Sequence, residues 1–211
     1  MYDPLVYLYI IENTHTLSTN QKIHQILCHH FPNNPWPSAS ALVSRDVRGK
    51  PFLPQFPHIH ISVTHSGKWF VCAISPLPVG IDIQKHTLLH KETDTEVCQR
   101  YCNISRRFFH PDESDYIAQD PYHRFFRIWT AKESYVKYTG QGIDSMYSHF
   151  SVLPNNSKDL QSLGSLLSWQ ADSVHFLQTD LGEGYTFCMC SAQPASWRWI
   201  HLSKDMQHLL P

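Results

Sequence analysis

Two charged residues one helical turn apart are the first candidates for chemistry. Glu133 and Lys137 lie in the segment WTAKESYVK (residues 129–137) at positions i and i+4, where side chains on one face of a helix meet. A surface ion pair is the ordinary explanation of this spacing. The alternative is a carboxylate and an ammonium group that act on one ligand.

A second carboxylate favours the alternative. Asp82 lies 51 residues before Glu133, inside the apolar, β-branched run VGIDI (residues 79–83). A buried carboxylate without a partner is costly or takes up a proton, so Asp82 requires a partner or a metal. Mg²⁺ binds through one or two protein carboxylates and fills its remaining positions with water and phosphate oxygens. We therefore predict that Asp82 and Glu133 bind Mg²⁺ and that Lys137 contacts the same phosphate.

These segments resemble the two signature motifs of the Sfp-type 4′-phosphopantetheinyl transferases, the holo-carrier-protein synthases. Thr64 stands where the family has the first serine of its N-(I/L)-S-H-S segment. The other similar segments, in the family's order and spacing, are GKP (49–51), ISVTHS (61–66), RFFHPDE (107–113), GQG (140–142), HFSV (149–152) and the last strand (184–194). Chance does not explain so many matches in one order.

The resemblance implies an α+β fold of two similar halves in a pseudo-twofold arrangement. Each half would be a small antiparallel sheet with packed helices, and coenzyme A would lie between them. The prolines at Pro76 and Pro78 indicate the boundary. We therefore expect an N-terminal half, residues 1–77, and a C-terminal half, residues 78–211, that carries both signature motifs.

The resemblance also implies the reaction. The enzyme would transfer the 4′-phosphopantetheine arm of coenzyme A to a serine of an apo acyl or peptidyl carrier protein, with 3′,5′-ADP as the leaving group. The serine needs a general base. Glu133 is the first choice, directly or through a bound water, and Glu113 of the RFFHPDE segment is the second. Glu113 could equally be a solvated residue of an acidic loop with Asp112 and Asp115.

By resemblance, Lys50, Pro51 and Thr64 contact the adenine and ribose of coenzyme A, and His65 contacts its 3′-phosphate. The family also places basic residues for this phosphate on its first helix, where this chain offers Lys22. Many members carry a second acid two residues after the aspartate, as a further metal ligand, and Gln84 occupies that position here. Its neutral amide can still bind Mg²⁺ or hold a metal-bound water, so we expect weaker metal affinity and retained activity.

Local patterns predict the elements that position these residues. Val6–Ile10 alternates as a strand, Ser18 to Asn20 are helix-capping residues, and a hairpin should turn at Ser66–Lys68 between the strands 59–64 and 69–74. Further helices are expected around 91–101 and 112–118. The signature helix has apolar residues on two sides, at Ile128, Ala131, Tyr135 and Tyr138 and at Trp129 and Val136. It should therefore be largely buried, with both charges directed into a cleft.

The segment after this helix, Gly140 to Asp172, should by resemblance meet the carrier protein. Its apolar residues could receive an amphipathic carrier helix or simply pack onto the second sheet, two alternatives that the sequence leaves open. These residues are Ile143, Met146, Tyr147 and Phe150.

Composition excludes several other classes of protein. The 211 residues are 42% hydrophobic and 13% aromatic, which suffices for a core, and the net charge of −1 gives no basic surface for nucleic acid or anionic membrane. No apolar stretch approaches the roughly 18 residues that span a bilayer, and the N-terminus lacks the pattern of a signal peptide. We expect a cytoplasmic monomer with internal pseudo-dimer symmetry and six reduced cysteines. The alternatives are a catalytically impaired carrier-binding homologue and another Mg²⁺-dependent nucleotide phosphohydrolase.

Overall fold

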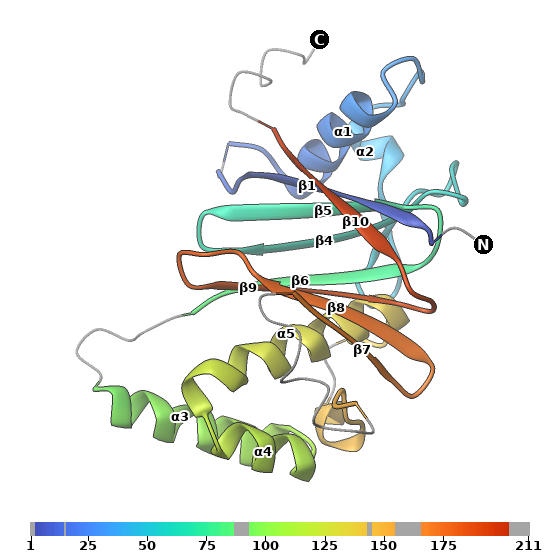
Figure 1. Ribbon diagram of the computed structural model, residues 1–211. Coiled ribbons are helices and arrows are strands. Elements are labelled where there is room, and N and C mark those ends of the chain that lie inside the picture. Colours follow the sequence, from blue (N-terminus) through green and yellow to red (C-terminus); the bar gives the residue numbers. More distant parts are fainter. Residues whose placement is uncertain (1–2, 15, 87–92, 143–144, 155–165, 203–211) are drawn as a thin grey trace. The chain divides into compact units, whose positions relative to one another are not determined.

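The computed structural model describes residues 3–14, 16–86, 93–142, 145–154 and 166–202, and the chain divides into two compact units (Figure 1). The first unit contains Met1–Val79 and Pro194–Pro211, and the second contains Gly80–Gln193. Each unit has a four-stranded sheet with packed helices, so the predicted α+β class is confirmed. None of the described helices is long and apolar enough to cross a membrane.

The first unit is built on a sheet with strand order β10-β1-β5-β4. The β1–β5 and β4–β5 pairs are antiparallel, whereas β1 and β10 are parallel. A short β2–β3 pair completes the unit. Its elements are β1 (Leu5–Glu12), α1 (Thr19–His30), α2 (Ala39–Leu42), β2 (Ser44–Arg45), β3 (Pro51–Phe52), β4 (His60–Ser66), β5 (Trp69–Ser75) and β10 (Ser196–His201).

Local sequence signals account for much of this unit. The Ser18 side chain accepts a hydrogen bond from the backbone N–H of Gln21, and the Gln21 side chain accepts one from the N–H of Ser18, which fixes the start of α1. The β4–β5 hairpin pairs Ser66 with Trp69 across a two-residue turn in which Gly67 has φ 52°. The predicted capping cluster and hairpin are confirmed.

The core of the first unit lies where α1 covers the sheet. Ile23, Ile26 and Leu27 of the helix pack with Tyr9 and Phe70 of the strands, and all five are at most 2% exposed. Burial of apolar side chains on one face of an amphipathic helix stabilises this arrangement. Successive residues of a strand point to opposite faces of the sheet, so the residues between these core positions lie on the other face.

The second unit pairs its strands in the order β6-β9-β8-β7. Its core contains the aromatic residues of α5 and buried residues of β8 and β9, among them Phe125, Phe176 and Cys188. The elements are β6 (Val79–Lys85), α3 (Asp94–Phe108), α4 (Pro111–Ala118), α5 (Pro121–Thr139), the 3₁₀ helix η1 (Ser145–His149), β7 (Leu166–Ala171), β8 (Val174–Asp180) and β9 (Tyr185–Ser191). The predicted start of α3 near residue 91 lies outside the described residues, and α3 begins after its cap Thr93.

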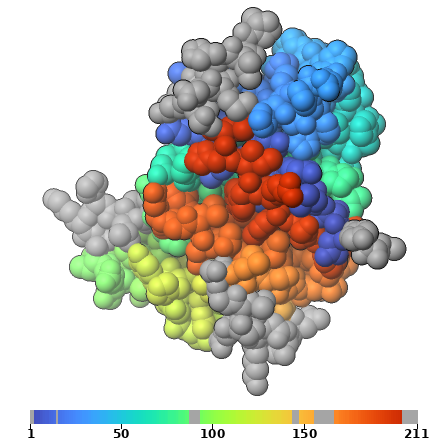
Figure 2. All heavy atoms as spheres, turned by 45° about the horizontal axis from the view of Figure 1, so that its top comes forward, coloured from blue at the N-terminus to red at the C-terminus, as the bar shows by residue number. Residues whose placement is uncertain are grey.

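The division of the chain differs from the predicted one at two points. The first boundary follows Val79 rather than residue 77, and the C-terminal strand β10 belongs to the first unit. In the space-filling view its atoms (red) lie at the surface beside those of β1 (blue) (Figure 2). A strand pattern does not reveal which sheet edge the strand will join, because that choice depends on long-range pairing. The parallel pair also makes the first sheet mixed rather than purely antiparallel.

All six cysteines are free thiols, as predicted.

Candidate active site

Gly80 lets the strand that carries Asp82 pack directly on the helix that carries Glu133 and Lys137. A Cβ atom at Gly80 would lie 2.0 Å from the main-chain oxygen of Ser134 and 2.3 Å from the main-chain nitrogen of Tyr138. Only glycine permits such a close approach of two backbones. The VGID segment thus brings β6 against the last turns of α5.

Asp82 is 1% exposed and forms an ion pair with Lys137. The Lys137 Nζ donates to Asp82 Oδ1 over 2.6 Å, and the Gln84 Nε2 donates to Oδ2 over 3.1 Å. The explanation of Glu133 and Lys137 as an ordinary surface ion pair is therefore wrong. The helix directs the ammonium group to the strand, where it neutralises a buried carboxylate.

Glu133 is 7% exposed and lies near enough to Asp82 to be affected by its charge. Burial and the charge of Asp82 raise the pKa of Glu133, while the hydrogen bond from Tyr147 and the charge of Lys137 oppose the increase. The Tyr147 hydroxyl donates to Glu133 Oε1 over 2.6 Å. Burial and the neighbouring Glu133 raise the pKa of Tyr147, so this hydroxyl keeps its proton at neutral pH.

These residues have the chemistry of a Mg²⁺ site. A buried carboxylate whose pKa is raised by a second carboxylate beside it, as that of Glu133 is raised by Asp82, is an arrangement that a hard divalent cation relieves. A carboxylate can accept several contacts, so the hydrogen bonds from Lys137, Gln84 and Tyr147 do not prevent Asp82 and Glu133 from binding a cation. The donor set therefore fits Mg²⁺, and Asp82 and Glu133 stay its predicted ligands. Gln84 stays a predicted third ligand; its amide nitrogen is turned toward Asp82.

Glu113 is 0% exposed, so the alternative that it is a solvated residue of an acidic loop is wrong. Its carboxylate forms an ion pair with the Lys132 Nζ, at 2.9 Å from Oε1 and 2.8 Å from Oε2. The backbone N–H of Val152 donates to Oε1 and that of His110 to Oε2. Glu113 thus anchors α4, α5 and the segment after η1; its role as the second-choice general base stays a prediction.

Lys132 is the residue that sequence reasoning missed. It is 0% exposed, beside Glu133 in the sequence, and its Nζ also donates to the main-chain oxygen of Phe150 over 2.7 Å. The same Nζ lies 3.9 Å from the centre of the Phe150 ring. The available signal was a lysine in the middle of a helix predicted to be buried on two faces, since such a charge requires a carboxylate partner.

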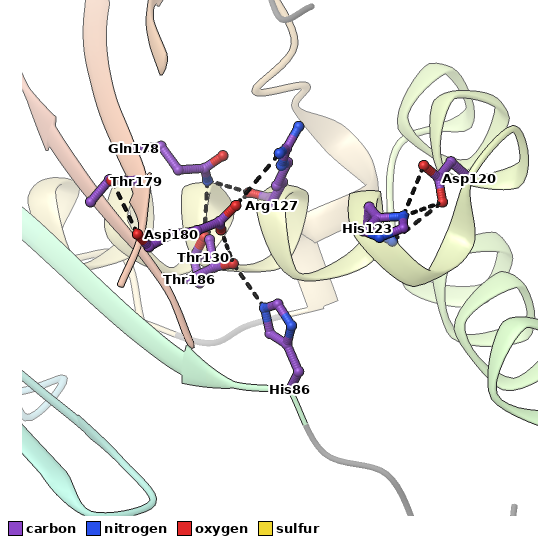
Figure 3. A network of polar contacts seen from close by, with 9 residues as sticks. All are labelled: His86, Asp120, His123, Arg127, Thr130, Gln178, Thr179, Asp180 and Thr186. Atoms are coloured by element: carbon purple, nitrogen blue, oxygen red, sulfur yellow. Dashed lines mark hydrogen bonds and ion pairs between the residues drawn. The ribbon is translucent and has the colours of Figure 1, made fainter. Parts of the chain in front are cut away.

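A polar network holds the first half of α5 against the sheet (Figure 3). The Gln178 Nε2 donates to the main-chain oxygen of Arg127 over 2.8 Å, and the Arg127 guanidinium lies 3.6 Å from Asp180 Oδ2. The Thr186 hydroxyl donates to Asp180 Oδ1 over 2.8 Å, and His86 Nε2 lies 2.9 Å from that hydroxyl. Because His86 follows β6 directly, the network fixes both site-bearing elements on the same strands β8 and β9.

In the first unit, Lys50 and Pro51 line a pocket of about 280 Å³. The backbone N–H of Lys50 donates to Asp46 Oδ1, within a tight turn in which Gly49 has φ 88°. His60 of β4 lies in the same lining. The pocket therefore joins the GKP segment to the strand that carries Thr64 and His65.

Thr64 and His65 lie on opposite faces of β4, because successive strand residues alternate. Thr64 is buried and His65 is exposed. Lys22 is 5% exposed, donates to Asn13 Oδ1 over 2.9 Å and lies 5.1 Å from the centre of the Phe70 ring. The contact of Lys22 with the 3′-phosphate stays a prediction. In the structure its ammonium group already contacts Asn13 and Phe70.

Of the predicted carrier-facing residues, Tyr147 is 8% exposed within the core and Phe150 packs against that core. This favours the packing alternative for both. The residue Ile143 and the side chain of Met146 lie outside what the structure describes.

Comparison with known proteins finds a matching family model and several similar proteins. A family model, the 4′-phosphopantetheinyl transferase superfamily, matches residues 78–205. A 4′-phosphopantetheinyl transferase of Bacillus subtilis is 33% identical over 150 residues, 69% of this chain and 61% of that protein. The 4′-phosphopantetheinyl transferase psf-1 of Bacillus pumilus is 31% identical over 171 residues, 79% of this chain and 67% of that protein. The 4′-phosphopantetheinyl transferase Sfp of Bacillus subtilis (strain 168) is 31% identical, and the match covers 69% of this chain and 61% of Sfp.

Proposed function

This chain belongs to the 4′-phosphopantetheinyl transferase superfamily, and on that premise we propose that it transfers the 4′-phosphopantetheine arm of coenzyme A to a serine of an apo carrier protein. The observation that carries the proposal is the juxtaposition of Asp82, Glu133 and Lys137, two buried carboxylates and one ammonium group from β6 and α5. This donor set suits a magnesium pyrophosphate.

The proposed reaction is a displacement at the β-phosphorus of coenzyme A. The serine oxygen forms a bond to that phosphorus while the bond to the bridging oxygen breaks, and 3′,5′-ADP leaves with the electron pair. Lys137 is 29% exposed at its side chain, so its ammonium group can bind a phosphate oxygen while it remains close to Asp82. Mg²⁺ bound by Asp82 and Glu133 would supply the positive charge that offsets charge on the pyrophosphate.

Glu133 is the proposed acceptor of the serine proton. Its carboxylate is 7% exposed and lies in the same site as Asp82 and Lys137, where it would accept the proton directly or through a bound water. The hydrogen bond from Tyr147 occupies only one lone pair of Oε1, so the carboxylate retains capacity for the proton.

The contacts with coenzyme A, the partner and the location of the protein are further proposals. Lys50 and Pro51, which line the pocket of the first unit, would contact the adenine and ribose, and exposed His65 the 3′-phosphate. The partner would be an apo acyl or peptidyl carrier protein, and the protein a cytoplasmic monomer that binds neither nucleic acid nor membrane.

The test is mass spectrometry of a panel of apo carrier proteins after incubation with coenzyme A, Mg²⁺ and the protein. The proposal requires a mass gain of one phosphopantetheine arm on the carrier serine and release of 3′,5′-ADP. Cleavage of coenzyme A without a carrier would indicate the phosphohydrolase alternative. Carrier binding without any mass gain across the panel would indicate the impaired homologue.

A further inference from the structure

Tyr147 is the hydrogen-bond donor that the structure places on the carboxylate of Glu133, with an oxygen-to-oxygen distance of 2.6 Å. The donor comes from η1, 14 residues after Glu133, and no feature of the two signature motifs includes it. We propose that Tyr147 is a positioning residue that orients Glu133 as a ligand for Mg²⁺. This inference rests on the proposed function of the site.

The physical need for such a donor follows from the glutamate side chain. The torsion that turns its terminal carboxylate is broad, so burial alone leaves the direction of the two oxygens poorly defined. A short hydrogen bond to Oε1 fixes this torsion and leaves Oε2 free to face a cation. Partners of this kind typically change metal affinity by about 10- to 100-fold when they are removed.

The tyrosine can perform this role because its own ring is held by an aromatic cage. The Tyr147 ring meets Phe109 at 6.3 Å, Trp129 at 6.5 Å and Phe150 at 6.2 Å between centroids. Edge-to-face contacts of this kind favour one ring orientation. Tyr147 is 8% exposed, so few alternative positions are open to its hydroxyl.

The buried ion pair provides the second support. The Lys132 Nζ lies 5.8 Å from the centre of the Tyr147 ring and donates to the main-chain oxygen of Phe150, while Glu113 accepts from the N–H of Val152. The segment that follows η1 is therefore tied to α5 at Phe150 and to α4 at Val152. The contacts of Glu113 and Lys132 thus fix the segment after η1, and this segment helps to fix Tyr147. The Tyr147 hydroxyl in turn orients the carboxylate of Glu133.

The test compares Tyr147→Phe with the control Tyr135→Phe. Phenylalanine keeps every ring contact of Tyr147 and removes only the hydroxyl. Tyr135 is a matched control because it packs against the same Phe150, at 4.7 Å between centroids, without a place in the proposed machinery. Mn²⁺ serves as the probe, and its binding is measured directly by electron paramagnetic resonance of the free ion.

We expect Tyr147→Phe to bind Mn²⁺ about 10-fold more weakly and to need about 10-fold more Mg²⁺ for half-maximal transfer. Its kcat at saturating Mg²⁺ should stay within about threefold of the wild-type value, since the bound metal then restores the orientation of Glu133. The control should match the wild type in both measurements. A loss caused only by altered packing would instead lower kcat at every Mg²⁺ concentration, with unchanged Mn²⁺ affinity.

Wild-type Mn²⁺ affinity in folded Tyr147→Phe would overturn the positioning role. Should Tyr147→Phe unfold, Phe150→Leu is used instead, because it loosens the packing around the Tyr147 ring and keeps the hydroxyl. A positioning role predicts weaker Mn²⁺ binding by folded Phe150→Leu, and unchanged Mn²⁺ affinity refutes it. A wild-type protein that binds Mn²⁺ but transfers nothing would contradict the proposed function, while the comparison of Mn²⁺ affinities would still decide the role of Tyr147.

Discussion

Substitution of Gly80 by alanine should damage stability and transfer together. The new Cβ atom would lie 2.0 Å from the Ser134 oxygen and 2.3 Å from the Tyr138 nitrogen, both of them backbone atoms that cannot rotate away. To reach about 3.0 Å, the shortest separation that real Cβ atoms show, β6 and α5 must part by about 1 Å. Overpacking of a rigid contact costs about 1–3 kcal/mol, and the upper end applies here because backbone lies on both sides.

The Gly80→Ala substitution should be measurable both in thermal unfolding and in the rate of transfer. For a chain of this size a loss of 1 kcal/mol lowers Tm by roughly 2–4 °C, so Gly80→Ala should lower it by about 6–12 °C. The same displacement would lengthen the 2.6 Å contact between Lys137 and Asp82. A misplacement of about 1 Å at a reacting centre can reduce the rate about 100-fold, so the folded variant should transfer phosphopantetheine at about 1% of the wild-type rate.

Gly182→Ala is the control. A Cβ atom at Gly182 meets no atom within 4 Å, but φ of +73° makes the position unfavourable for alanine by roughly 1–2 kcal/mol. Calorimetry and the carrier mass assay should therefore show a smaller loss of Tm and normal transfer for this variant. The reasoning about Gly80 is refuted if Gly80→Ala is as stable and as active as the control.

Three further predictions concern Glu133, Lys132 and Gln84. Glu133→Gln should abolish transfer in the mass assay; near wild-type transfer would remove Glu133 from the reaction. Since the pKa of Glu133 is raised in the folded protein, its favourable contribution to stability is present below its unfolded pKa and is lost as pH rises through the folded pKa. Without Mg²⁺, Glu133→Gln should therefore gain Tm relative to the wild type as pH rises across that window, and a constant difference would contradict this. Lys132→Met should cost about 3–5 kcal/mol in urea denaturation, because it leaves the 0%-exposed carboxylate of Glu113 unpaired, whereas a loss below 1 kcal/mol would show that the pair contributes little. Gln84→Glu removes the amide donor from Asp82 and adds a carboxylate, so it should lower Tm without Mg²⁺ and lower the Mg²⁺ concentration for half-maximal transfer; an unchanged or higher concentration places Gln84 outside the metal site.

The sequence by itself determined the features that depend on neighbours along the chain. Ser18 caps α1 through Gln21, Gly67 forms the hairpin turn, and the apolar positions of the signature helix predict its burial. The interactions behind these features span only a few residues, so spacing and residue type suffice to predict them. The buried position of Asp82 was predictable for a related reason, because an apolar run predicts a buried strand.

Only the tertiary structure decided which groups meet. The i,i+4 spacing allowed Glu133 and Lys137 to pair, but the packing of β6 on α5 gave Lys137 to Asp82, 55 positions away. The carboxylate of Glu133 instead accepts a hydrogen bond from the Tyr147 hydroxyl. A charge that loses water on burial pairs with whichever partner the fold brings within about 3 Å, and that choice depends on long-range packing that local spacing does not encode.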